Sequence, residues 1–106
     1  MALFIFGYVT TRGDKVRHIK VNVKGQVQGV GFRYFTQQAA TENAIVGWVR
    51  NEDDGSVLIE AQGEDKNVDA FLNEVEKGPT KFARVQDMEV KELAEDTELT
   101  KFEVKY

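Results

Sequence analysis

The residues best suited to chemistry in this sequence are Arg33 and the glycine-rich stretch that precedes it, Gly25 to Gly31. Glycines let consecutive backbone N–H groups converge on one point, because residues without a Cβ adopt the conformations of an anion-binding nest. The arginine adds a permanent charge and a planar fork of donors that matches the oxygens of a phosphate. We therefore predict an anion site here, sized for one phosphoryl group.

The same stretch lacks the features of a nucleotide-binding loop. A P-loop places Lys and Ser or Thr directly after its glycines, whereas here Gly31 is followed by Phe32 and Arg33. The pattern is therefore not suited to a triphosphate with its magnesium ion. The side chains of Gln26 and Gln28 are further candidate donors to a bound anion.

The elements that must position this loop are a strand before it and a helix after it. Residues 18–23 alternate apolar with polar side chains, which is typical of a strand with one buried face. From Phe32 onward the apolar residues fall on one helical face, and Asn43 can end that helix. Helix-start amides and the macrodipole then add positive potential at the end of the loop.

A hairpin and a second helix come next in the chain. Strand patterns over 45–51 and 57–61 flank Glu52–Gly55, which is typical of a hairpin turn. The apolar residues of 65–77 have helical spacing, and Gly78-Pro79 ends this helix.

Two more strands are predicted, over 82–90 and 102–106. Val85 and Met88 disagree in phase within the first of them, which indicates a β-bulge. Between the two strands we expect an acidic, solvated loop over 92–100.

The order β-α-β-β-α-β with a short C-terminal strand predicts an α+β, ferredoxin-like sandwich. Its sheet is rich in antiparallel pairs and carries both helices on one face. Right-handed crossovers make the first two strands parallel, so their carboxyl ends lie at one edge of the sheet, where ligands of open α/β sheets gather. Two segments reach that edge: the glycine loop with Arg33, and Arg50-Asn51.

Composition excludes several other kinds of site. A chain of 106 residues makes one domain. It has no cysteine, and His18 is its only histidine, so neither a thiolate nor a multi-His metal site can form. A net charge of -4 works against a nucleic-acid partner. Glu52, Asp53 and Asp54 lack the spacing of an EF-hand, and we expect His18 at the surface or at an edge.

Residues 1–16 form an N-terminal extension to a predicted domain of residues 17–106. The apolar start Leu3–Phe6 is far shorter than the ~20 residues of a membrane-spanning helix. It also lacks the basic region and the cleavage pattern of a secretory signal. We therefore expect a soluble, cytoplasmic protein with no membrane partner, whose extension is disordered or adds an edge strand.

Two motifs in register make this sequence resemble the acylphosphatase family. The family's glycine loop, G-x-V-Q-G-V-x-F-R, is matched by Gly25 to Arg33, and its second motif, G-W-V-x-N-x-x-x-G, by Gly47 to Gly55. The resemblance extends over residues 17–106. It implies a metal-independent enzyme that hydrolyses the carboxyl–phosphate bond of acyl phosphates to a carboxylate and inorganic phosphate.

The resemblance also implies the roles of the residues that would form the site. Arg33 binds the phosphate and Asn51 orients the attacking water. No metal or other cofactor is required. The partner is a small-molecule acyl phosphate, and the protein is expected to be a monomer. The leaving carboxylate is the base of an acid with a pKa of about 4, so no general acid is needed. The backbone amides that cradle the phosphate are those of Gln26, Val27, Gln28, Gly29, Val30 and Gly31.

Two residues differ from those of some relatives, and one residue of the second motif has no expected role in binding. Glu52 replaces a small polar residue of some relatives, next to the site of an anionic substrate. Lys105 stands where some relatives have arginine, which keeps the charge but loses a bidentate contact. We expect Trp48 to serve packing rather than to bind a ligand.

Two other functions are open at this point. One is a non-catalytic module that binds acyl or carbamoyl phosphate, like the acylphosphatase-like segment at the start of larger carbamoyl-transfer proteins; the length of this chain favours the enzyme. The other is an RNA-binding module of the same topology. That module needs stacking aromatics on its central strands, and 18–23 and 57–61 contain none.

Overall fold

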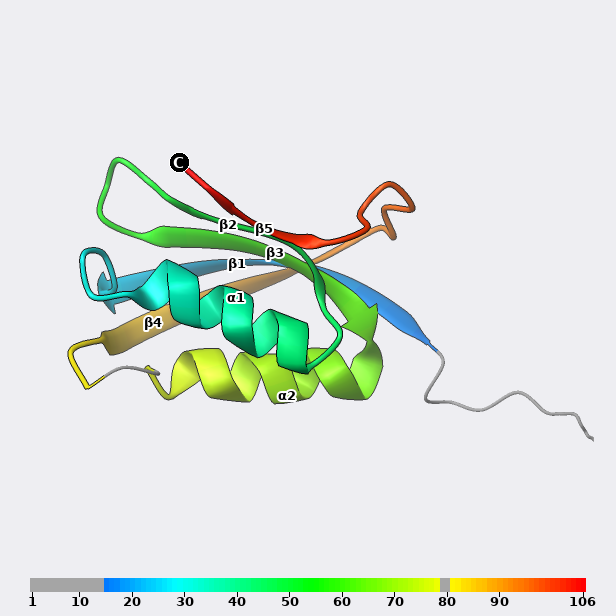
Figure 1. Ribbon diagram of the computed structural model, residues 1–106, viewed down its shortest axis with the longest axis horizontal. Helices are drawn as coiled ribbons and strands as arrows, with labels where there is room; N and C mark the ends of the chain where they lie inside the picture. The colour runs from blue at the N-terminus through cyan, green and yellow to red at the C-terminus, as the bar shows by residue number, and fades with distance from the viewer. Residues whose placement is uncertain (1–14, 79–80) are drawn as a thin grey trace, which may run out of the picture.

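The computed structural model describes residues 15–78 and 81–106. The expectations for most of the N-terminal extension and for Pro79 fall on residues outside these ranges. Within them, one sheet carries two helices on one of its faces (Figure 1). The elements in chain order are β1 (Val16–Gln26), α1 (Phe32–Glu42), β2 (Val46–Asn51), β3 (Val57–Glu64), α2 (Asp65–Glu76), β4 (Arg84–Leu93) and β5 (Phe102–Lys105).

The sheet has five strands in the order β4-β1-β3-β2-β5. The pairs β1–β3, β1–β4 and β2–β3 are antiparallel, and only β2–β5 is parallel. The predicted α+β, ferredoxin-like fold with a short C-terminal strand is confirmed. None of the helices within the described residues is long and apolar enough to cross a membrane.

The core lies between the sheet and the two helices. Ile19, Val21 and Val23 of β1 face it and are fully buried, as their alternation with polar residues predicts. The helices add the apolar faces that their spacing predicts. The buried residues of α1 and α2 are Phe32, Thr36, Ala39, Ala40, Val68, Phe71 and Val75.

The ends of the first helix follow from local chemistry. No side chain caps its start, where Gly31 has a left-handed conformation with φ 78°. At its other end the Asn43 side chain donates to the Ala39 carbonyl at 2.8 Å, which satisfies one of the last carbonyls of the helix. The prediction that Asn43 ends this helix is confirmed.

The strand β4 is longer than predicted and contains the predicted bulge. Its residues pair with β1 in a register that shifts between Lys24, opposite Asp87, and Gly25, opposite Val85. Gln86 is the extra residue, and it allows Val85 and Met88 both to pack against the core despite their odd spacing. The expected loop begins only after Leu93.

The expectation that His18 lies at the surface or at an edge is wrong. Its ring is buried on the face of the sheet opposite the helices, with Nδ1 2.7 Å from the Ala94 carbonyl and Nε2 3.0 Å from Glu60 Oε1. The loop after β4 folds back over this face, and Gln62 exchanges two hydrogen bonds with the backbone of Asp96. The alternation of apolar and polar residues in β1 cannot show that a loop distant in the sequence covers His18.

The edge that carries the functional segments is set by pairing with β3. Val57 at the start of β3 pairs with Val23 on one side and with Asn51 on the other. The carboxyl ends of β1 and β2 therefore reach the same edge of the sheet, as predicted, and β1 continues past Val23 to Gln26 in pairing with β4. In Figure 1 the loop before α1, the hairpin between β2 and β3, and the C terminus gather at this end of the molecule.

Gly47 in β2 offers a test of the close approach between β2 and β3. It has φ 143°, and a Cβ on it would lie 1.9 Å from the Glu60 carbonyl oxygen. We expect Gly47→Ala to lower the free energy of unfolding by about 3 kcal/mol, through backbone strain and overpacking, as measured by urea denaturation.

Gly55→Ala is the matched control for this substitution. It has φ 93° but open space around its Cβ position, so only backbone strain of about 1–2 kcal/mol applies. Equal losses for the two variants would contradict the close contact described at Gly47.

Candidate active site

The loop between β1 and α1 has the geometry of an anion cradle. Gly29 and Gly31 adopt φ 75° and 78°, in the left-handed region that side-chain-bearing residues rarely enter. Val27, which lies in sequence between the end of β1 and Gly29, is buried and so fixes the loop to the core. The loop runs into the uncapped start of α1, where backbone N–H groups and the helix dipole favour a negative charge.

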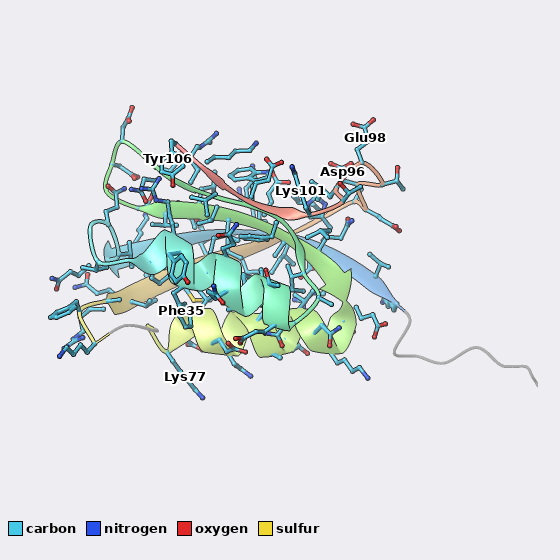
Figure 2. The ribbon with its side chains drawn as sticks, in the orientation of Figure 1. Phe35, Lys77, Asp96, Glu98, Lys101 and Tyr106 are labelled. Carbon is cyan, nitrogen blue, oxygen red and sulfur yellow. The ribbon has the colours of Figure 1, made fainter. Side chains whose placement is uncertain are left out.

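Arg33 lies in the first turn of α1 and reaches across to the end of β5. Its Nη1 donates to the Lys105 carbonyl at 3.1 Å, and its guanidinium carbon lies 4.6 Å from the centre of the Tyr106 ring. Tyr106 is labelled in Figure 2, where it stands at the end of β5 near the start of α1. The C-terminal residues therefore hold the guanidinium beside the loop.

Asn51 ends β2 on the face of the sheet that the helices cover, two residues after the buried Val49. Its Oδ1 is buried, and no group within the described residues donates a hydrogen bond to it. A buried acceptor left without a donor costs about 1–3 kcal/mol. Such an atom is suited to accept from a bound water or from a substrate.

A cavity of about 690 Å³ brings these groups together. The two predicted catalytic residues, Arg33 and Asn51, both line it, although they come from a helix and a strand. Of the predicted cradle, Val27, Gly29 and Gly31 line the cavity, whereas Gln26, Gln28 and Val30 do not. The other lining residues are Phe32, Tyr34, Gln37, Lys101, Phe102, Glu103, Val104 and Tyr106.

Of the two glutamines of the loop, Gln28 differs from the expectation that its side chain donates to an anion. Gln28 Nε2 donates to the Glu52 and Ser56 carbonyls, at 2.8 Å each, so both of its N–H groups are used. Its side chain therefore ties the loop to the hairpin that follows Asn51. Gln26 is exposed at the end of β1, where it pairs with Arg84.

The hairpin after Asn51 is held by its own polar groups. Glu52 N–H donates to the Ser56 carbonyl at 2.8 Å. Asp54 Oδ1 accepts from the Ser56 hydroxyl at 2.6 Å and from its N–H at 2.9 Å, and these bonds lower the pKa of the Asp54 carboxyl. Glu52 Oε2 pairs with Arg50 Nε at 2.8 Å. No cluster of three potential metal ligands occurs within residues 15–78 and 81–106.

Sequence reasoning missed two aromatic contacts near the site. One is the stacking of Tyr106 on Arg33, which joins residues far apart in the chain. The other is at Trp48, whose ring has Arg50 at 5.1 Å and Lys105 at 4.7 Å from its centre. The spacing of Trp48 and Arg50, two residues apart on one strand face, is the signal that could have revealed the second contact.

Comparisons with known proteins give one consistent family. The family model for acylphosphatase matches residues 19–104. The chain is 99% identical over 91 residues to an acylphosphatase of Oceanobacillus iheyensis, a match that covers 86% of this chain and 100% of that protein.

Two solved structures share the fold. The crystal structure of acylphosphatase from Bacillus subtilis has a TM-score of 0.81 at 38% identity and covers 85% of this chain and 99% of its own. Full-length HypF in its phosphate- and nucleotide-bound form also has a TM-score of 0.81, at 30% identity. That match covers 95% of this chain but only 13% of HypF.

The tie from Gln28 to the hairpin generates a prediction about the loop. Gln28→Ala removes two hydrogen bonds, and we expect it to lower the free energy of unfolding by about 2 kcal/mol. Because the loop is then less constrained, the dissociation constant for inorganic phosphate should also rise, as measured by calorimetry. Gln26→Ala, at the exposed end of β1, is the matched control; an equal loss in that variant would refute the role of the tie.

Proposed function

Because this chain belongs to the acylphosphatase family, we propose that Arg33, the glycine-loop amides and Asn51 together carry out its reaction, the hydrolysis of an acyl phosphate. The observation that carries the assignment of residues is that Gly29, Gly31, Arg33 and Asn51 line one cavity. Backbone N–H groups, an arginine and an acceptor that has no donor among the described residues then line the same cavity.

The phosphoryl group of the substrate occupies the loop in this proposal. Phosphoryl transfer depends mostly on positioning and on stabilising charge around the equatorial oxygens. Backbone amides between Gln26 and Gly31 donate to these oxygens, and Arg33 adds its charge. By comparison with oxyanion donors in other enzymes, each such donor contributes about 3 kcal/mol to transition-state stabilisation.

Asn51 supplies the orientation of the nucleophile. Its Oδ1 accepts a hydrogen bond from the attacking water, which supports an in-line approach to phosphorus. The water oxygen forms a bond to phosphorus while the bond between phosphorus and the acyl oxygen breaks. The electron pair of that bond leaves with the carboxylate, and the water proton passes to phosphate or solvent. The products are a carboxylate and inorganic phosphate.

The chemistry of the leaving group explains why so few side chains suffice. A carboxylate is a weak base, with a conjugate-acid pKa of about 4, so it departs without protonation. Positioning by Asn51 and charge stabilisation by Arg33 are then the main requirements. We propose that the reaction proceeds without a metal ion.

We also propose that the protein works as a monomer in the cytoplasm. All the groups assigned here come from a single chain, so no second copy is needed to complete the cavity. Size-exclusion chromatography with light scattering tests the monomer, and fractionation of the cells that make the protein tests the location.

The second candidate function is binding of an acyl or carbamoyl phosphate without hydrolysis. The observation behind it is the likeness to full-length HypF, a larger protein whose structure is described as phosphate- and nucleotide-bound. Release of phosphate from benzoyl phosphate by the purified protein separates the two candidates. Tight binding of phosphate without turnover would favour the binding module.

Substitutions at the two assigned side chains test their roles separately. We expect Arg33→Met to lower kcat/KM for benzoyl phosphate about 1000-fold and to weaken inhibition by inorganic phosphate, because Arg33 both binds and stabilises. Asn51→Ala should lower kcat about 100-fold with little change in phosphate inhibition, because it orients only the water. Near-normal turnover of either variant, with an unchanged free energy of unfolding, removes that residue from the mechanism.

Treatment with EDTA tests metal independence. We expect the rate of benzoyl phosphate hydrolysis to stay within about twofold of the untreated rate, because a carboxylate of this basicity needs no metal to leave. Addition of Mg²⁺ to the treated protein serves as the control. Loss of activity with EDTA and its return with Mg²⁺ would contradict the proposal.

A further inference from the structure

Two cations face each other on the side of the sheet opposite the helices. Because Gly47 and Val49 face the helices, Trp48 and Arg50 lie on the opposite face, and Lys105 shares that face in β5. Arg50 and Lys105 are direct partners in the parallel pairing of β2 with β5. Like charges placed opposite each other in a sheet are destabilising, so this arrangement needs a compensating contact.

Trp48 and Glu52 supply this compensation. Both cations lie over the Trp48 ring, with Arg50 Cζ at 5.1 Å and Lys105 Nζ at 4.7 Å from its centre. These distances are within the range of cation–π attraction. Arg50 has a second partner in the carboxylate of Glu52 at 2.8 Å. Trp48 therefore bridges two positive side chains that would otherwise repel each other.

The same lysine connects this cluster to the active site. Its carbonyl oxygen accepts the hydrogen bond from Arg33 Nη1, on the other side of the backbone from its ammonium group. β5 has only four residues and, in the described sheet, a single neighbouring strand, so few main-chain contacts hold its end. By holding the Lys105 side chain, the Trp48 ring can therefore also fix the position of the Lys105 carbonyl that accepts from Arg33.

We propose that Trp48 is a positioning residue for Arg33 and acts through Lys105. Trp48 holds the ammonium of Lys105, the Lys105 carbonyl holds the guanidinium, and the guanidinium stays directed at the phosphate site. The inference rests on the proposed function, because it assigns Arg33 to phosphate binding. It differs from the expectation that Trp48 serves packing alone, since a purely packing residue would affect stability without changing affinity for phosphate.

Substitutions of Lys105 test this without disturbing the core. Lys105→Met removes the ammonium but keeps the carbonyl and an unbranched side chain of nearly the same length. From the strength of exposed cation–π contacts, we expect the inhibition constant of inorganic phosphate, measured against benzoyl phosphate, to rise about two- to fivefold. Lys105→Arg keeps a cation over the ring and should restore the wild-type constant.

Lys77→Met is the matched control for loss of charge. Lys77 directly follows α2, is exposed and does not line the cavity. Figure 2 labels it well away from Tyr106. If the loss of one positive charge alone mattered, this substitution would weaken phosphate inhibition as much as Lys105→Met.

Trp48 provides a second measurement, because it is the only tryptophan in the chain. We expect phosphate to change its fluorescence emission in the wild-type protein and in Lys105→Arg, and the change to be lost in Lys105→Met. Trp48→Phe, which keeps an aromatic face, should retain phosphate inhibition within about twofold, whereas Trp48→Leu should match Lys105→Met.

The outcomes separate this inference from the proposed function. An unchanged inhibition constant in Lys105→Met, or an equal rise in Lys77→Met, would overturn the role of Trp48 and leave the proposed function intact. A wild-type protein that neither binds phosphate nor hydrolyses benzoyl phosphate would overturn both. Unfolding by urea, measured for each variant, identifies any loss of affinity that comes from loss of the fold.

Discussion

The place of the active site depends on the double pairing of Val57. Because this residue pairs with Val23 of β1 and with Asn51 of β2, the segments that follow these two residues leave the same edge of the sheet, where β1 continues to Gln26 in pairing with β4. The glycine loop follows β1 and the hairpin follows β2. This pairing brings the start of α1 and the carboxamide of Asn51 to one cavity. The two hydrogen bonds from Gln28 then hold the glycine loop against the hairpin.

An acidic protein can hold an anion here because local geometry outweighs net charge. The chain carries a net charge of -4, yet the cradle is made of backbone amides and the start of a helix, whose partial charges do not depend on composition. Arg33 adds a full positive charge to the cavity, where its Nη1 donates to the Lys105 carbonyl at 3.1 Å. Distant carboxylates are weakened by solvent and salt, whereas the groups in the cavity act at contact distance.

The sequence predicts the elements well because their signals are local. The alternation in β1, the helical spacing in α2 and the phase error at Val85 and Met88 each arise within a few residues, and the structure bears them out. The errors concern contacts between distant segments. His18 is covered by a loop more than seventy residues away, and the donors of Gln28 are taken by a hairpin. A pattern within one strand reports the face of a side chain but not what covers that face.

The bulge in β4 has a consequence beyond packing. In the part of the chain that the structure describes, β4 is an outer strand of ten residues, long enough for a strand of another molecule to pair along it. The extra residue at Gln86 interrupts the regular spacing of donors and acceptors, and it increases the local twist. A strand of another molecule would therefore find an interrupted row of hydrogen-bonding groups on a twisted edge. The bulge that lets Val85 and Met88 reach the core therefore also disfavours aggregation through pairing at this edge.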